Sequence, residues 1–292
     1  MSTIASRAEQ LLGVSVVSTT PVAGGDVSTA TRLRLSDGRS AFMKTRPHSP
    51  ADFFVSEARG LRWLGEAAET GGAPVPEVYA VAEDCLIMTW IDPGRATADA
   101  AEALARALAE THRAGADEFG AEYNGYIGTV PLLNDSADGW PEFWVRRRVL
   151  PYLKIARDRL AISAADTAAI EEVADRIGEF AGPPEAPARL HGDLWSGNIV
   201  WAADGPARLV DPAAHAGHRE TDLAMLALFG APHLARVLDA YDEAFPLADG
   251  WRERVPLHQL HPLLVHAVLF GGSYGASAAQ AARRYAGATG TR

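Results

Sequence analysis

The sequence changes character at Asp92-Pro93-Gly94, and this change limits the folds that the chain can adopt. Before it, most segments have the short apolar runs of strands, and the segment after Ser49-Pro50 has helical spacing, with Ser49 expected to cap the helix. After it, helical spacing dominates, apart from a polar island at 189–218. We therefore predict an α+β fold with two lobes. The small antiparallel-sheet lobe spans 1–91 with a hinge at its end, and the larger helical lobe spans 92–292.

The periodicity gives approximate limits for these elements. The expected strands are 14–17, 30–35, 40–45, 75–81 and 85–91, and the helix in the small lobe that begins at Ile4 stops at Gly13. The expected helices of the large lobe are 97–115, 141–158, 163–180, 221–230, 232–244 and 256–271. Within the second of these, the run Arg146-Arg147-Arg148 is typical of a solvated face.

The charge balance excludes several classes of partner. The chain of 292 residues has 27 Lys and Arg against 37 Asp and Glu, a net charge of −10. Nucleic acids and anionic membranes both require a basic surface, so neither is expected as a partner. The single cysteine, Cys85, excludes an internal disulfide and fits a reducing compartment. No apolar stretch approaches the ~20 residues of a membrane span, and no signal peptide is visible. We expect a cytoplasmic protein and, by default, a monomer.

The polar island contains the segment His191-Gly192-Asp193-Leu194-Trp195-Ser196-Gly197-Asn198. Here an Asp precedes an Asn by five residues, as in the protein-kinase catalytic loop, where the Asp is the base and the Asn holds Mg²⁺. Asp211 follows a short apolar strand, at the place where a second metal ligand is needed. Phosphoryl transfer needs Mg²⁺, a carboxylate near the acceptor hydroxyl, and cations on the phosphates. Asp193, Asn198 and Asp211 meet the first two needs.

The small lobe offers the remaining parts of an ATP site. Lys44 lies on a predicted strand and Glu57 on the next helix, where a phosphate-binding Lys and its ion-pair partner belong. Upstream, Gly24-Gly25 could place backbone N–H groups over phosphates. Thr89, Trp90 and Ile91, just before the break, lie where adenine would meet the backbone. The predicted cofactors are ATP and Mg²⁺.

Each of these features also has a simpler explanation. A glycine pair is usually a turn, and a lone Lys on a strand is usually a solvated charge. An Asp with an Asn can simply cap a helix or stabilise a turn. Glu66 and Glu69 offer other registers for the partner of Lys44. The argument for a site is the order of six elements: Gly-Gly, Lys, Glu, hinge, Asp-x₄-Asn and strand-Asp. This is the order found in protein kinases, so we predict a protein-kinase-like bilobal fold whose small lobe binds nucleotide.

Residues around the acceptor are harder to assign. Trp195 could stack on a sugar face or pack under the loop. His218 could contact the substrate or be a hydrogen-bonded structural histidine. Glu220 and Asp222 suit the start of the following helix, where carboxylates favour the helix dipole.

At this point the sequence resembles the fructosamine kinases (ketosamine 3-kinases), in the aminoglycoside phosphotransferase-like branch of the kinase fold. His-Gly-Asp-Leu at 191–194 is shared across that branch, whereas Trp195-Ser196 and Asp211-Pro212-Ala213 are more specific to fructosamine kinases. The segment 217–225, Gly-His-Arg-Glu-Thr-Asp-Leu-Ala-Met, also resembles the family. So do Trp140-Pro141 with Phe143, Phe229-Gly230, and the stretch with His266 and Phe270-Gly271. The similarity extends over nearly the whole chain.

The resemblance implies a phosphotransferase that moves the γ-phosphate of ATP to the 3-hydroxyl of a ketoamine, free or protein-bound, such as fructosyl-lysine or ribulosyl-lysine. The 3-phosphate then eliminates and frees the amine, so that the protein is repaired by deglycation. By motif, Asp193 is the base, Asn198 and Asp211 bind Mg²⁺, and Lys44 binds phosphate and is oriented by Glu57. The glycine loop has Asp26 where some members have a cysteine, so no thiol switch is expected.

Two alternatives remain open at this point. An aminoglycoside kinase, or another small-molecule hydroxyl kinase of the same fold, would share the loop chemistry and differ in its acceptor residues. A pseudokinase acting as a binding module would have lost a catalytic residue, but Lys44, Asp193, Asn198 and Asp211 are all present. The sequence does not indicate which ketoamine is the substrate.

Overall fold

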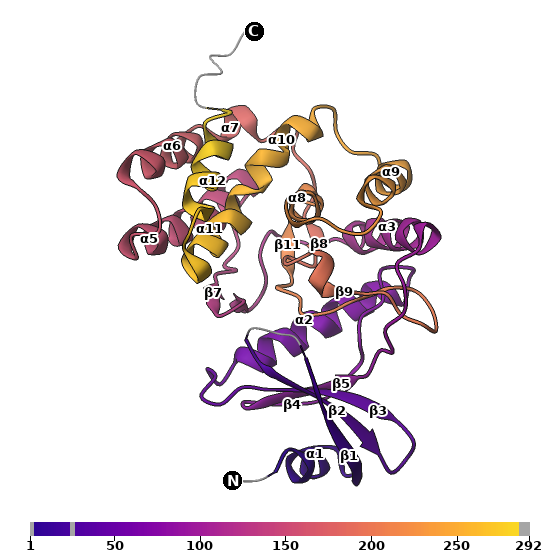
Figure 1. Cartoon of the computed structure of the whole chain (residues 1–292). Helices are drawn as coiled ribbons and strands as arrows, with labels where there is room; N and C mark the ends of the chain where they lie inside the picture. The colour runs from indigo at the N-terminus through magenta and orange to yellow at the C-terminus, as the bar shows by residue number, and fades with distance from the viewer. Residues whose placement is uncertain (1–2, 24–26, 286–292) are drawn as a thin grey trace.

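The computed structural model describes residues 3–23 and 27–285, and in it a small sheet lobe lies below a larger helical lobe (Figure 1). The sheet has the strand order β1-β2-β3-β5-β4, and every neighbouring pair is antiparallel. Lys44 lies in the central strand, opposite Ala30 on one side and Leu86 on the other. The strands are β1 (Val16–Val22), β2 (Thr29–Leu35), β3 (Ser40–Thr45), β4 (Val78–Ala82) and β5 (Cys85–Thr89). The predicted α+β architecture is confirmed.

Two helices cover this sheet. The helix α1 (Ile4–Leu12) packs its apolar stripe on a core of Leu33, Met43 and Ile87. It ends at Gly13, whose φ of 67° is a left-handed conformation that glycine adopts without strain. The helix α2 (Phe53–Ala68) packs against a second core that includes Leu86 and Met88. Because residues alternate between the two faces of a strand, β5 supplies apolar side chains to both cores.

The start of α2 differs from the sequence prediction. We expected Ser49 to cap the helix, but the helix begins at Phe53, and Asp52 stands at its N-cap without a side-chain capping bond. The Ser49 hydroxyl instead donates to the backbone carbonyls of Arg46 and Glu83. Ser and Thr hydroxyls often satisfy nearby backbone groups in loops, and this local bonding competed with the capping role.

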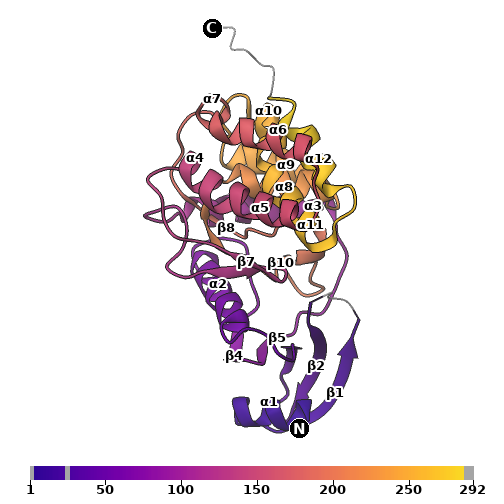
Figure 2. The same cartoon turned by 90° about the vertical axis from the view of Figure 1, so that its left-hand side faces the viewer.

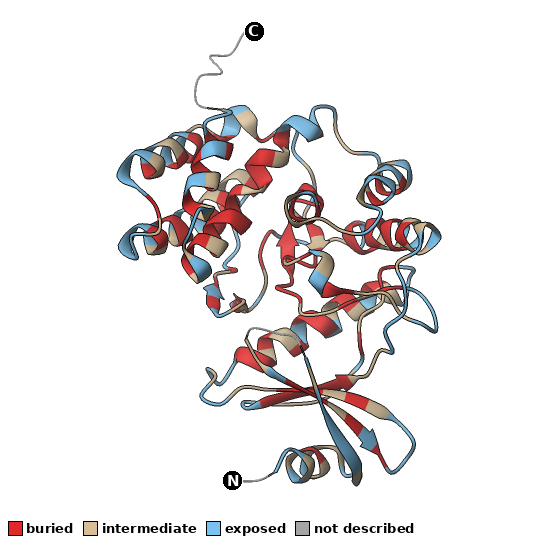
Figure 3. Ribbon diagram, in the orientation of Figure 1, coloured by how far each residue is buried: buried red, intermediate tan, exposed pale blue. Residues whose placement is uncertain are grey.

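The helical lobe has two cores. One packs α5, α6, α11 and α12 around Tyr152 and Leu264, and the other packs α3, α8 and α9 around Leu108 and Tyr241. Figure 3 shows the buried residues gathered along the inner faces of these helices. The helices are α3 (Ala98–Arg113), α4 (Trp140–Phe143), α5 (Leu150–Asp158), α6 (Ala164–Asp175), α7 (Ile177–Phe180), α8 (Glu220–Phe229), α9 (Leu234–Ala244), α10 (Trp251–His258), α11 (Leu260–Phe270) and α12 (Tyr274–Ala282).

A π-helical segment, Trp144–Val149, joins α4 to α5 where one continuous helix was expected. The wider π turn brings Arg148 into the interior, so the prediction of a solvated basic face is wrong for this residue, which is only 3% exposed. Its guanidinium donates to Asn134 Oδ1 and to the Leu133 carbonyl. Burial lowers the pKa of Arg148 to about 10.

Short strand pairs position the loops of the helical lobe. They are β6 (Gly125–Ile127) with β7 (Val130–Leu132), β8 (Ala188–Leu190) with β11 (His215–Gly217), and β9 (Ile199–Val200) with β10 (Arg208–Leu209). The polar island seen in the sequence therefore becomes two small antiparallel pairs. Residues 191–198, called the catalytic loop segment because they resemble the kinase catalytic loop, run between β8 and β9, and Asp211 follows β10.

The helix α2 lies between the two lobes (Figure 2) and contacts both. A Cβ atom on Gly60 would lie 3.0 Å from the Cβ of Ala214, so glycine permits this close approach to the helical lobe. From the helical lobe, Arg189 donates to the Trp63 carbonyl and pairs with Glu66 at 3.1 Å. Glu66, which the sequence left as a possible partner of Lys44, therefore serves to fasten α2.

Candidate active site

A cavity of about 790 Å³ lies between the lobes. Its sheet side is formed by β2, β3 and β5, and its helical side by the loops after β8 and β10, the β6–β7 hairpin and α11. Most of the residues singled out in the sequence line this one cavity: Lys44, Glu57, Thr89, Trp90, Ile91, Asp193, Trp195, Asn198 and Asp211. Lys44 and Asp211, which are 167 positions apart in the sequence, therefore meet at one site.

Lys44 binds two carboxylates from different elements. Its Nζ lies 2.8 Å and 3.0 Å from the two carboxylate oxygens of Glu57 and 3.0 Å from Oδ1 of Asp211. Burial alone would lower the pKa of Lys44, but the two carboxylates outweigh burial and raise it. The lysine therefore stays charged at any physiological pH. Glu66 and Glu69 do not occupy the partner position.

The catalytic loop segment holds Asp193 and Asn198 side by side. The amide nitrogen of Asn198 donates to the backbone carbonyl of Asp193 at 2.8 Å and to its carboxylate at 3.1 Å. The amide oxygen of Asn198 is thus left as the free oxygen of a cavity-lining side chain. Burial raises the pKa of Asp193 to about 7, against the opposing effect of the Asn198 hydrogen bond, and the charge of Asp211 adds to the rise. Such a carboxyl can accept or release a proton near neutral pH.

A buried aspartate from a later helix holds this loop in place. Asp222, on α8, accepts the backbone N–H groups of His191 at 2.8 Å and Gly192 at 2.9 Å. His112 contacts the same carboxylate at 3.1 Å and is itself bonded to the Tyr241 hydroxyl at 2.7 Å. We expected Asp222 to serve the helix dipole, but its carboxylate fixes the backbone of the catalytic loop. Sequence spacing gave no sign of this role, because the partners are 30 or more residues away.

The backbone conformation of Asp211 and the hydrogen bonds of its neighbours fix the position of this residue. Its φ is 56°, in the left-handed region that Asp tolerates better than most residues. On either side, Val210 N–H donates to the Asn198 carbonyl at 3.0 Å, and Ala213 N–H donates to the His191 carbonyl at 2.9 Å. These bonds tie the Asp211 turn to the catalytic loop, so the three polar side chains at 193, 198 and 211 have a shared scaffold.

The hinge residues lie along the edge of the cavity. Thr89 N–H is bonded to the Glu77 carbonyl and Trp90 N–H to the Ser40 carbonyl, so these two donors serve the sheet. The Trp90 ring is held by Asp92, which accepts its Nε1–H at 2.7 Å, and by the Arg32 guanidinium 4.5 Å from the ring centroid. The loop residues Gly24, Gly25 and Asp26 lie outside the described residues.

Two residues were considered for the acceptor, and the structure places only one of them at the cavity. Trp195 lines the cavity and is 40% exposed, while its ring packs over Gly197, where a Cβ atom would collide with it. His218 does not line the cavity and is 3% exposed. Its ring lies 4.9 Å from that of Trp140 and 4.8 Å from that of His258, which is the environment of a packing histidine.

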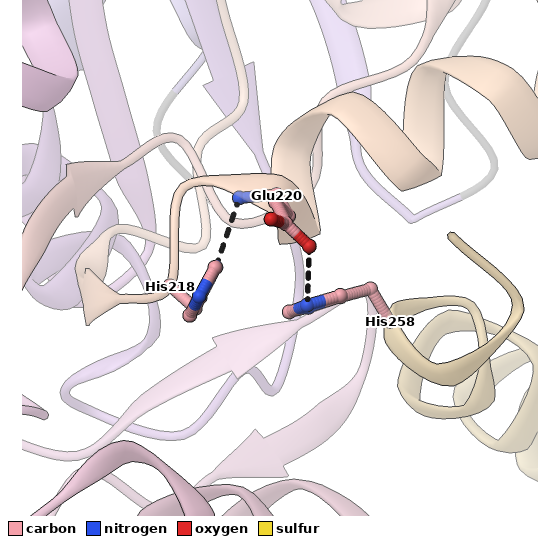
Figure 4. Close-up of side chains that lie close together, drawn as sticks. All are labelled: His218, Glu220 and His258. Atoms are coloured by element: carbon pink, nitrogen blue, oxygen red, sulfur yellow. Dashed lines mark hydrogen bonds and ion pairs between the residues drawn. The ribbon is translucent and has the colours of Figure 1, made fainter. Parts of the chain in front are cut away.

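His218 belongs to a buried cluster with Glu220 and His258 (Figure 4). Their potential metal-ligand atoms lie within 4.8 Å of one another. Both carboxylate oxygens of Glu220, however, accept hydrogen bonds from Arg254, which neutralises their charge. Nδ1 of His218 lies 3.3 Å from the Glu220 backbone N–H. The cluster therefore stabilises the start of α8 through the ion pair between Glu220 and Arg254.

The cavity between a sheet lobe and a helical lobe, with a Lys–Glu pair facing an Asp, an Asn and a second Asp, defines a phosphotransferase of the protein-kinase-like fold. The model of the fructosamine kinase family matches residues 1–286. The chain belongs to this family.

Individual relatives agree with this assignment. The chain is 35% identical over 265 residues to a relative from Enterococcus faecium named a probable ketoamine kinase, with 89% of this chain and 92% of the relative covered. It is 34% identical over 266 residues to the chloroplastic protein-ribulosamine 3-kinase of Arabidopsis thaliana, covering 88% of this chain and 79% of that protein. It is therefore an ATP-dependent kinase of this family.

Solved structures show the same relationship. A fructosamine-3-kinase candidate from Thermobifida fusca has a TM-score of 0.91 and 47% identity, covering 97% of this chain and 98% of that one. Antibiotic phosphotransferases match with TM-scores of 0.62 and 0.59 at 16% and 14% identity, which shows a shared fold alone.

No helix of the described part of the chain is long and apolar enough to cross a membrane.

Proposed function

We propose that this protein transfers the γ-phosphate of ATP to the 3-hydroxyl of a ketoamine of the fructosyl-lysine or ribulosyl-lysine type. β-Elimination then releases inorganic phosphate, and water hydrolyses the resulting imine to the free amine and a 3-deoxyosone, so the reaction serves deglycation. The observation that carries the proposal is the charge distribution of the cavity. Its charged lining in the described part of the chain is Lys44, Glu57, Asp193 and Asp211, all at the phosphate-transfer centre, and the remaining lining is uncharged.

This distribution favours a ketoamine over an aminoglycoside. An aminoglycoside has several protonated amines, which require several carboxylates for binding. The rest of the cavity instead presents aromatic and apolar side chains from the β6–β7 hairpin and α11, including Tyr126, Leu269 and Phe270. A small sugar that carries no amine other than the one joining it to an aliphatic chain fits such a lining.

The residues of the site suggest a role for each group. Asp193, with its pKa near 7, accepts the proton of the attacking hydroxyl. Lys44, held by Glu57, binds phosphate oxygens. Asn198, through its free amide oxygen, and Asp211 offer the oxygen ligands that Mg²⁺ prefers. Bound there, Mg²⁺ would offset the charge of the phosphates. Thr89, Trp90 and Ile91 border the adenine, with Gly24 and Gly25 proposed for the phosphates, and Trp195 faces the sugar.

The test is an ATP-consumption assay with synthetic ribulosyl-lysine, fructosyl-lysine and a panel of aminoglycosides. We expect Mg²⁺-dependent turnover with the ketoamines and none with the aminoglycosides, and phosphorus NMR of the product should show a 3-phosphate ester. Phosphorylation of an aminoglycoside with a higher kcat/KM than either ketoamine would overturn the proposal. Asp211→Asn protein, prepared in parallel, controls for contaminating kinases. Free and protein-bound ketoamines can be compared in the same assay.

A further inference from the structure

The acceptor end of the cavity contains one histidine that the reaction does not yet use. His266 lies on α11 and, among the histidines of residues 3–23 and 27–285, is the one that lines the cavity. Its neighbours Val265, Leu269 and Phe270 line the same wall. Opposite them is the turn of the β6–β7 hairpin, where a Cβ atom on Gly128 would lie 3.0 Å from the Leu269 side chain. The hairpin and α11 therefore enclose this end.

The hydrogen bonding of His266, a residue of the cavity lining, determines which of its ring nitrogens is left as an acceptor. Nδ1 lies 2.8 Å from the backbone carbonyl of Pro262. Because a carbonyl oxygen can only accept, Nδ1 has to carry the proton, and in the neutral ring Nε2 has a free lone pair. Nε2 has no hydrogen-bond partner among the described residues. Burial lowers the pKa of His266, so the ring is neutral at physiological pH.

Aromatic side chains hold the ring in its orientation. The Phe229 ring lies 4.4 Å from the His266 ring at an interplanar angle of 30°. Phe270 and Tyr274 pack against it at 5.4 Å and 5.1 Å. A ring packed in this way loses little entropy when Nε2 receives a hydrogen bond, because its rotamer is already fixed.

The side chains that line the cavity around His266 determine from which kind of donor its Nε2 can accept a hydrogen bond. The cavity carboxylates are already bound to other groups: Glu57 and Asp211 to Lys44, and Asp193 to Asn198. Phe270 is 59% exposed and Trp195 40% exposed, so aromatic faces are available at the mouth of the cavity. A neutral acceptor beside aromatic faces suits a single organic cation with an N–H donor.

We propose that Nε2 of His266 accepts a hydrogen bond from the protonated secondary amine of the ketoamine, and that His266 is thereby a specificity-determining residue for the amine-bearing part of the acceptor. This inference rests on the proposed function. It adds that the enzyme recognises the amine itself, through a histidine whose tautomer is set by the Pro262 carbonyl, rather than the sugar alone.

The experiment compares two acceptors and three variants. The acceptors are fructosyl-lysine and 1-deoxyfructose, which lacks the amine. His266→Phe keeps an aromatic ring but removes both nitrogens, and His266→Gln can return an acceptor oxygen near the Nε2 position. Tyr274→Phe is the matched control, because Tyr274 packs on His266 without lining the cavity. Steady-state kinetics give KM and kcat for each acceptor and the KM for ATP, and thermal unfolding checks the fold of each variant.

With fructosyl-lysine, we expect His266→Phe to raise KM about 10- to 100-fold, the range for losing a hydrogen bond to a charged donor, with little change in kcat or in the KM for ATP. His266→Gln should recover most of this loss, and Tyr274→Phe should match the wild type. With 1-deoxyfructose, the wild type and His266→Phe should have the same KM. An unchanged KM for fructosyl-lysine in His266→Phe, or an equal penalty with 1-deoxyfructose, would overturn the inference. Inactivity of the wild type with every ketoamine would instead refute the proposed function.

Discussion

Replacing Asp193 by Asn should slow catalysis and stabilise the protein at the same time. The carboxyl is mostly buried, and its pKa rises from 3.8 to about 7. A raised carboxyl pKa means that the folded chain prefers the neutral form, so ionisation costs stability. The cost is absent below pH 4, grows between pH 4 and 7, and is complete above pH 7. Asn removes this cost because it cannot ionise, and it can still accept from Asn198.

The magnitude follows from the shift. A rise from 3.8 to about 7 corresponds to about 4 kcal/mol in full. Since Asp193 is partly exposed and solvent screens its charge, we expect roughly 1–2 kcal/mol, or about 2–5 °C in Tm. The variant should therefore melt higher than the wild type at pH 8, and the difference should be much smaller at pH 4.5. Because a general base contributes about 10²- to 10⁴-fold, kcat should fall by that factor while the KM for ATP changes little.

Differential scanning fluorimetry in EDTA at both pH values, followed by ATP-consumption kinetics at pH 7.5, measures both effects on the same protein. If the kcat of the Asp193→Asn variant lies within tenfold of the wild-type value, Asp193 does not take part in the proton transfer. A Tm difference that is the same at pH 8 and pH 4.5 would refute the electrostatic argument, because a neutral packing effect does not depend on pH.

Other positions give shorter tests. Asp211→Asn should abolish Mg²⁺-dependent turnover, and turnover of this variant in EDTA would contradict its assignment as a metal ligand. Gly192→Ala should lower Tm and kcat together, because φ is 81° and a Cβ would lie 2.2 Å from the Ala213 carbonyl oxygen; Gly205→Ala, which meets nothing within 4 Å, should leave both within error. Asp222→Ala should cost about 3–5 kcal/mol in urea unfolding, since it removes the partner of two buried N–H groups and of His112; a loss below 1 kcal/mol would argue against its role in holding the loop.

The sequence predicted the parts of the fold that depend on local pattern. The strand over Ser40–Thr45 and the stop of α1 at Gly13 agree with the structure because alternation and a left-handed glycine are local signals. The order of Lys44, Glu57, Asp193 and Asn198 along the chain predicted a shared cavity, because the ATP-site residues of protein kinases follow one another in the same order.

Features that depend on tertiary contacts could not be predicted. In the π-helical segment, Arg148 reaches Asn134 and the Leu133 carbonyl in the interior, and a run of three arginines gives no sign of which one turns inward. The short β6–β7 hairpin and α12 were not predicted from the sequence; the turn of the hairpin lies against Leu269 of α11, and α12 packs against α6 and α11. His218 was taken as a possible substrate contact because it follows Asp211 closely, but its ring packs against those of Trp140 and His258 and does not line the cavity.

Position 211 requires both a left-handed backbone conformation and a carboxylate side chain. Together these requirements limit the residues that can replace Asp211 within the family. Few residue types tolerate a left-handed φ of 56°, and of these Gly and Asn leave the turn intact while removing the carboxylate. A saturation library selected only for abundance in the cell should therefore retain Gly and Asn at this codon, whereas selection for growth on a glycated nutrient should retain Asp alone. Gly or Asn at this position is therefore the expected sign of a family member that keeps the fold and has lost the reaction.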